Sequence, residues 1–197
     1  MTTPQEYWQP YNCLAEATIY NKRNEIVPWN WIMENADVIA LLFTAKGVDK
    51  DGIIEKFYGI YENVKYVNMP IEVIYVPMDE CEREARSCYD EQANWFTLKL
   101  HDPLVLTLKF MHGITCIPHI LVTKVDGTVV SSHGVMDLEE YGKNAVITWL
   151  SISASAKHHR RMSKDAEMYG EKWHYLGAAK KDQEYHKKYS IVEEASV

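Results

Sequence analysis

Two long apolar runs dominate the hydrophobic pattern of the chain. The segments DVIALLF (37–43) and IEVIYVP (71–77) are continuous apolar stretches of strand length. Such runs are typical of strands that are covered on both faces, so we expect both to lie inside a sheet. Between them, apolar residues recur at helical spacing on one face, namely Ile54, Phe57, Tyr61 and Val64. The order strand, helix, strand predicts a parallel pair joined by a right-handed crossover.

Shorter apolar stretches predict the remaining strands. Two of them flank the polar turn Asn21–Asn24 in ATIYNKRNEIVPW, a pattern that is typical of a β-hairpin. The segment PHILVTKVDGTVVSSHG (118–134) predicts another pair of strands around Asp126 and Gly127, because an Asp-Gly pair favours a tight hairpin turn. We therefore expect one hairpin before the central unit and one after it along the chain.

Four further segments predict helical structure. WNWIMENA (29–36) predicts a short helix or turn, and MDECEREARSCYDEQ (78–92) predicts a charged surface helix. In DPLVLTLKFMHG, Asp102 is the expected N-cap and Pro103 the first helical residue, with Gly113 at the end. MDLEEYGKNAVITWL (136–150) predicts one final helix. The side chains expected on buried faces are Cys81, Ala85 and Cys88 in the charged helix and Leu138, Tyr141, Ala145 and Trp149 in the last one.

Length and composition indicate one compact domain with a tail. A chain of 197 residues that is 47% hydrophobic can bury a sizeable core. We expect an N-terminal extension (1–14), the domain (15–150) and a helical, mildly basic tail (151–197). The longest apolar runs are far shorter than the ~20 residues of a membrane span, and the first residues lack a signal-peptide pattern. We therefore expect no membrane association and a cytoplasmic protein, with the nucleus as an alternative.

Charge is distributed unevenly between body and tail. Residues 1–150 hold 12 Lys and Arg against 21 Asp and Glu, net −9, whereas residues 151–197 are net +2. An acidic body argues against a nucleic-acid-binding domain, because phosphate contacts require a basic face. Only the tail could make such contacts, through Arg160 and Arg161. Trp173 and Tyr175 are expected to pack the tail against the domain or another chain, so an oligomer is an alternative.

The order of these elements, together with several sequence segments, resembles the tryparedoxin and nucleoredoxin-like branch of the thioredoxin superfamily. The segments are NKRNEIVPWNWI, ALLFTA, IEVIYVPMDE, NWFTLKLHDPLVLTLKFMHGITCIPHILVTKVDG and EEYGKNAVITWL. The resemblance covers roughly residues 15–150. It implies a thioredoxin-like α/β fold, a central mixed β-sheet flanked by helices, to which the tail adds a C-terminal helical extension.

The segment FTAKGVDKDG (43–52) stands where the resembling family has its redox loop. In that family the loop continues as W-C-x-x-C, and the first cysteine lies at a helix N-terminus, where the helix dipole lowers its pKa. Here Gly47 replaces the tryptophan, and Val48 and Asp51 replace the two cysteines. Without either thiol, we expect no disulfide reductase activity, and we expect Asp51 to cap the helix that follows.

A second part of the resembling site is retained in TCIPHI (115–120). The resemblance implies that the Pro118 peptide bond is cis and that Ile117 presents its backbone beside residues 47–49. In the family this wall holds extended polypeptide by backbone hydrogen bonds, a form of strand addition. The expected partner is therefore a protein or peptide, bound in a groove formed by Gly47, Val48, Ile117 and Pro118.

The four cysteines offer an alternative chemistry. Cys116 lies close to Pro118 and could act as a lone thiol, although a buried cysteine acting as a small hydrophobic residue is the favoured interpretation. Cys13 lies in an aromatic segment and could be exposed. Cys81 and Cys88 are seven residues apart on one helix, about 10 Å, which is too far for a disulfide. The cysteines and the tail histidines show no ligand spacing, so we expect no metal and no cofactor.

Three functions remain open from the sequence. The preferred one is a redox-inactive thioredoxin-fold protein that acts as a binding or scaffolding module, so we lean against an enzyme. The alternative is an unconventional thiol oxidoreductase that uses Cys116 or Cys13. The second alternative, which is less favoured, is a nucleic-acid-associated role of the basic tail.

Overall fold

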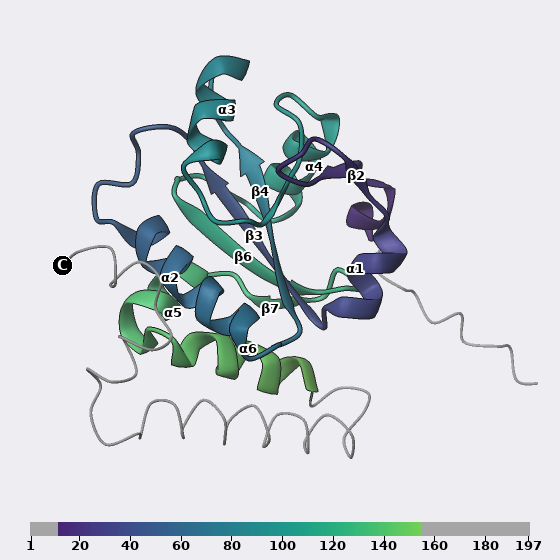
Figure 1. Ribbon diagram of the computed structural model, residues 1–197, viewed down its shortest axis with the longest axis vertical. Helices are drawn as coiled ribbons and strands as arrows, with labels where there is room; N and C mark the ends of the chain where they lie inside the picture. Colours follow the sequence, from purple (N-terminus) through teal and green to yellow (C-terminus); the bar gives the residue numbers. More distant parts are fainter. Residues whose placement is uncertain (1–11, 155–197) are drawn as a thin grey trace, which may run out of the picture.

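The computed structural model describes residues 12–154, which form a mixed sheet flanked by helices (Figure 1). The strands are β1 (Ile19–Tyr20), β2 (Ile26–Val27), β3 (Val38–Thr44), β4 (Ile71–Pro77), β5 (Phe96–Thr97), β6 (His119–Lys124) and β7 (Val129–Ser131). The helical segments are η1 (Cys13–Glu16), α1 (Trp29–Asn35), α2 (Ile53–Tyr66), α3 (Glu82–Asp90), α4 (Pro103–Met111), α5 (Gly134–Tyr141) and α6 (Asn144–Ala154).

The two apolar runs lie at the centre of the sheet, as their pattern predicts. Within the described residues, the strand order is β2-β1-β5-β4-β3-β6-β7. β3 pairs in parallel with β4 and antiparallel with β6, and every residue of β3 and β4 is buried. Both predicted hairpins are also confirmed, since β1 pairs with β2 and β6 with β7.

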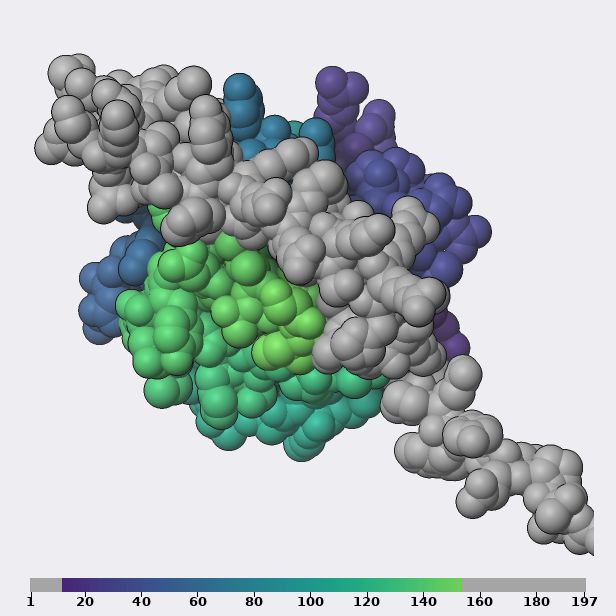
Figure 2. All heavy atoms as spheres, turned by 90° about the horizontal axis from the view of Figure 1, so that it is seen from below, coloured from purple at the N-terminus to yellow at the C-terminus, as the bar shows by residue number. Residues whose placement is uncertain are grey.

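Helices cover both faces of the sheet, which explains why the central strands lack polar alternation. Successive residues of β3 enter opposite cores: Val38, Ala40 and Leu42 pack with residues of α2, α5 and α6. Ile39, Leu41 and Phe43 pack with residues of η1 and α4. Seen from below, α5 and α6 lie beside the segment that contains β6 and β7 (Figure 2). The expected α/β architecture is thus confirmed.

The predicted final helix is wrong in one respect, because it consists of two helices. Gly142, with φ 56° and ψ −129°, ends α5 after Tyr141, and α6 begins at Asn144. Leu138, Ala145 and Trp149 are buried as expected, whereas Tyr141 is 51% exposed.

Two other expectations of burial need correction. Cys81 is exposed because it stands before the first turn of α3 as its N-cap, and only Ala85 and Cys88 reach the core. In α2, Ile53 is more deeply buried than Ile54. The predicted cap of α4 is confirmed, because the Asp102 side chain accepts a hydrogen bond from the Leu104 amide at 2.9 Å.

Helix α6 continues across residue 150 to Ala154, so the last described turn belongs to the domain. The helical tail beyond it, with Arg160, Arg161, Trp173 and Tyr175, lies outside the described residues. No helix within residues 12–154 is long and apolar enough to cross a membrane.

Candidate functional site

The loop 45–52 lies at the edge of the sheet where parallel strands β3 and β4 end, close to α3 (Figure 1). Gly47 and Gly52 adopt positive φ angles of 77° and 67°, which favour glycine. Backbone hydrogen bonds fold the loop tightly, since the Lys50 amide donates to the Val48 carbonyl at 2.9 Å. Gly47 is exposed, and Val48 is half-buried. The loop is therefore an ordered turn with accessible residues at its tip.

Asp49, rather than the expected Asp51, caps helix α2. The Asp49 carboxylate accepts hydrogen bonds from the amides of Ile53 and Ile54, both at 2.9 Å. Asp51 is exposed and forms no such bond. Helix α2 begins at Ile53, five residues after Val48. A side chain at position 48 is consequently not in the first turn of the helix, where the dipole would act on it most strongly.

Asp79 anchors the other end of the loop. Its buried carboxylate accepts hydrogen bonds from the Lys46 amide and from the Tyr75 hydroxyl, each at 2.7 Å. The Lys46 ammonium group donates to Ser87 Oγ at 2.6 Å, which connects the loop to α3. Burial and the bond to Asp79 raise the pKa of Tyr75, so its hydroxyl remains a proton donor. Sequence reasoning missed Asp79, although an aspartate two residues after a buried strand is a usable signal.

The opposite wall is formed by Ile117 and Pro118, whose peptide bond is cis as expected. In the β3–β6 ladder, Phe43 pairs with His119, so Pro118 lies beside the end of β3 where the loop starts. Both wall residues are half-buried. The ladder therefore brings Ile117 and Pro118 to the same edge of the sheet as Gly47 and Val48.

Helix α5 packs closely behind this wall because of Gly134. A Cβ atom at Gly134 would lie only 2.6 Å from Cγ2 of Ile120, so no larger residue fits without movement. His119 next to the wall is kept neutral, because burial and the nearby His133 lower its pKa. The N-terminus of α5 thus packs tightly against β6, the strand that follows the wall.

The thiols do not lie as the sequence predicted. Cys116 is exposed, although burial was the favoured interpretation, and Cys13, for which exposure had been considered, is buried. Burial raises the pKa of both Cys13 and Cys88, which disfavours their thiolates. All four cysteines are free, so the predicted absence of a Cys81–Cys88 disulfide agrees with the structure.

A hollow of about 390 Å³ opens beside the loop. It is lined by Gly47 and neighbouring loop residues, by Ile54 and Tyr58 of α2, and by Cys88 and Gln92 at the end of α3. The sequence did not predict that Cys88 would lie next to the loop 45–52. That proximity depends on the position of α3 relative to the loop, and a local sequence pattern does not predict this position.

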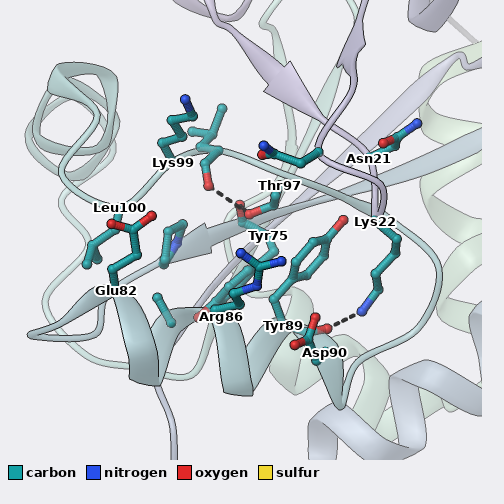
Figure 3. A pocket seen from close by; sticks show the side chains of 14 residues that line it. Asn21, Lys22, Tyr75, Glu82, Arg86, Tyr89, Asp90, Thr97, Lys99 and Leu100 are labelled. Atoms are coloured by element: carbon teal, nitrogen blue, oxygen red, sulfur yellow. Dashed lines mark hydrogen bonds between the residues drawn. The ribbon is translucent and has the colours of Figure 1, made fainter.

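A second, smaller hollow of about 110 Å³ lies between α3, the Asn21–Asn24 turn and residues 97–100 (Figure 3). Tyr75 and Tyr89 stack at its base, with ring centroids 5.8 Å apart. The Lys22 ammonium group donates to the carbonyls of Tyr89 and Gln92 and lies 4.0 Å from the Tyr89 ring centroid. Lys22 therefore fastens the β1–β2 hairpin to the end of α3, which is a structural role.

No group of histidine, cysteine and acidic side chains within residues 12–154 could hold a metal ion. The candidate tail contacts Arg160, Arg161, Trp173 and Tyr175 lie outside that range. The candidate site in the described part of the chain is therefore the sheet edge formed by the loop and the Ile117–Pro118 wall.

Comparison with known proteins agrees with this architecture. No family model matches the chain. Among solved structures, tryparedoxin from Trypanosoma brucei is similar with a TM-score of 0.60 and 19% identity, covering 68% of this chain and 92% of that one. Thioredoxin from Wuchereria bancrofti is similar with a TM-score of 0.57 and 21% identity, covering 66% and 90%. Tryparedoxin I from Leishmania major has a TM-score of 0.58 and 16% identity, covering 66% and 89%.

Sequence identities this low support a conclusion about the fold alone. The strand order, the cis peptide bond before Pro118 and the position of the loop after β3 agree with the expected architecture. The chain therefore has a tryparedoxin-like thioredoxin fold.

Proposed function

We propose that this chain binds an extended polypeptide segment at the edge formed by Gly47, Val48, Ile117 and Pro118, and that it does not catalyse dithiol–disulfide exchange. The observation that carries the proposal is the β3–β6 register, which sets the Ile117–Pro118 wall beside a loop that has no sulfur at positions 48 and 51. The wall and the missing sulfur atoms together support binding without disulfide exchange.

Disulfide exchange requires a thiolate that attacks one sulfur and a second thiol that resolves the mixed disulfide. Val48 has no lone pair with which to attack, and Asp51 cannot resolve a mixed disulfide. The nearest buried thiol, Cys88, has a raised pKa and remains protonated at neutral pH. The loop therefore lacks the groups for the reaction.

Binding needs exposed backbone on a rigid support. Asp49 and Asp79 hold the two ends of the loop through three hydrogen bonds of 2.7 to 2.9 Å, and the Tyr75 hydroxyl fixes Asp79 through a fourth. A preorganised loop loses little conformational entropy when a ligand binds. An extended segment that lies along residues 116–118 would add backbone hydrogen bonds in the manner of an edge strand.

A peptide selection tests this proposal. A library of random dodecapeptides displayed on phage is selected against the full-length protein, and the affinity of the recovered peptides is measured by calorimetry. Val48→Arg is expected to weaken their binding at least about tenfold, because it places a bulky charged side chain at the proposed contact. Val129→Arg on the distant strand β7, where Val129 is 44% exposed, is the matched control. Equal affinity for both variants, each with an unchanged melting temperature, would refute the groove.

The exposure of Cys116 favours one further candidate, a thiol activity at the same wall. In that reaction the Cys116 thiolate attacks a partner disulfide, a new S–S bond forms, and the displaced sulfur leaves as a thiolate. The test is thiol exchange with glutathione disulfide, followed by mass spectrometry. A mixed disulfide that forms in the wild type and disappears in Cys116→Ser supports this candidate, and no adduct in the wild type rejects it.

A further inference from the structure

The hollow of about 390 Å³ beside Gly47 has the features of a side-chain pocket. Gly47 borders both this hollow and the proposed groove. A Cβ atom built on Gly47 would meet no heavy atom within 4 Å, so the space at its Cα is open. A polypeptide in the groove can therefore direct one of its side chains past Gly47 into the hollow.

The rim of the hollow carries two carboxylates that are available to a ligand. Glu55 of α2 and Glu91 at the end of α3 line it, and both are exposed. Within residues 12–154, neither side-chain carboxylate takes part in an ion pair or a hydrogen bond. The other two charged groups of the lining are already engaged, since Lys46 donates to Ser87 and Asp49 caps α2. The lining thus carries three carboxylates against one ammonium group, a net charge of −2.

The floor of the hollow is neutral and largely apolar. Ile54 and Tyr58 supply half-buried carbon surface. Cys88 lies below them as a neutral thiol, since burial raises its pKa. Gln92 is fully engaged, because its amide donates to Cys88 Sγ at 3.2 Å and its carbonyl oxygen accepts from the Trp95 indole at 2.9 Å. An apolar floor beneath an acidic rim fits a side chain with an aliphatic stem and a cationic head.

Arginine fits this arrangement better than lysine does. Its planar guanidinium group can donate to two carboxylates and can stack on an aromatic ring such as that of Tyr58. The acidic body of the chain, net −9 over residues 1–150, attracts a basic partner. We infer that the hollow binds an arginine side chain of the polypeptide held in the groove, which makes arginine-containing extended segments the preferred partner class. This inference rests on the proposed function.

A single-residue probe tests the hollow separately from the groove. Nα-acetyl-arginine N-methylamide is titrated into the full-length ¹⁵N-labelled protein, with the citrulline analogue as an uncharged probe of the same shape. The arginine probe is expected to give saturable shifts of the Gly47 and Gln92 amides, and the citrulline probe to bind at least about fivefold more weakly. Glu55→Gln and Glu91→Gln should each weaken arginine binding by about the same factor. Glu139→Gln, at an exposed carboxylate of α5 that does not line the hollow, is the control and should change nothing.

Three results would overturn the inference. Equal binding of arginine and citrulline would remove the role of charge, and unchanged affinity in both glutamate variants would place the cation elsewhere. Shifts of Gly47 and Gln92 caused by Arg160→Gln with Arg161→Gln, without any probe, would assign the hollow to the chain's own tail. None of these depends on the phage selection, so a failed groove and a failed hollow are distinguished.

Discussion

Neighbouring side chains in the loop after Gly47 take different roles. Asp49 accepts two amide hydrogen bonds at the start of α2, whereas Val48 and Asp51 point to solvent in part or in full. Two aspartates, Asp49 and Asp51, precede α2, and either side chain is of a type that can cap a helix. Local pattern could not choose between them, because the choice depends on the left-handed conformation of Gly52, which sets where the helix begins.

Asp49→Ala should therefore destabilise the protein, and Asp51→Ala should not. Loss of the cap leaves two amides of α2 without their acceptor, which typically costs about 1 kcal/mol, with about 2 kcal/mol as the upper end. The free energy of unfolding from urea titrations measures the difference. Asp51→Ala is the matched control and should stay within about 0.5 kcal/mol of the wild type. If Asp51→Ala were the more harmful change, the assignment of the cap would be wrong.

Cysteine reactivity should divide the four thiols into two pairs. Cys81 and Cys116 are exposed, whereas Cys13 and Cys88 are buried and have raised pKa values. Labelling by iodoacetamide at pH 8 should modify the exposed pair at least about a hundredfold faster, because the buried pair must wait for local opening. Peptide mass spectrometry at timed intervals follows each site. Rapid labelling of Cys88 in the native protein would contradict its place in the floor of the hollow.

At the scale of elements, the break between α5 and α6 depends on one glycine. Gly142 has φ 56° and ψ −129°, a region that is almost closed to other residues. The helical periodicity of residues 136–150 concealed this break, because apolar residues continue on both sides of it. Gly142→Ala should lower the free energy of unfolding by about 1 to 3 kcal/mol. Glu139→Ala in α5 is the control for helix propensity, and an equally small effect of both changes would contradict the strain.

A buried carboxylate links α2 to β4 and should make stability depend on pH. Glu72 is 1% exposed and pairs with Lys65, and the Tyr61 hydroxyl donates to it at 3.3 Å. Burial raises the pKa of Glu72 above its ordinary value of 4.5, and this effect is larger than the lowering caused by the Lys65 ammonium group. The folded protein therefore holds this proton more tightly than the unfolded chain does. The resulting stabilisation is complete below the unfolded value and is lost as pH rises through the folded pKa.

Comparison with Glu72→Gln isolates this effect. The unfolding free energy of the wild type minus that of Glu72→Gln should be largest near about pH 4 and should decrease as the pH rises to about 7. Urea titrations at four pH values, with both proteins in the same buffers, measure the difference. A difference that grows with pH would show that Lys65 lowers the pKa more than burial raises it.

At the scale of the whole molecule, the sequence predicted the architecture well and the site only in part. The strands β3 and β4 were evident because apolar runs covered on both faces need no tertiary information. The positions of Cys13, Cys116 and Asp79 were not evident, because burial of a single residue depends on elements that are distant in the chain. The expected wall at Ile117 and Pro118 and the expected loop at Gly47 and Val48 do lie at one edge of the sheet.

We propose that this thioredoxin fold binds polypeptide at one edge of its sheet and does not catalyse dithiol–disulfide exchange. The most direct test is the reduction of insulin by dithiothreitol at neutral pH, followed by the turbidity of the released chains, with the full-length protein at micromolar concentration. We expect a rate equal to that of dithiothreitol alone, because no thiol occupies position 48 or 51. A rate typical of a thioredoxin, and above all one that Cys116→Ser abolishes, would contradict the account.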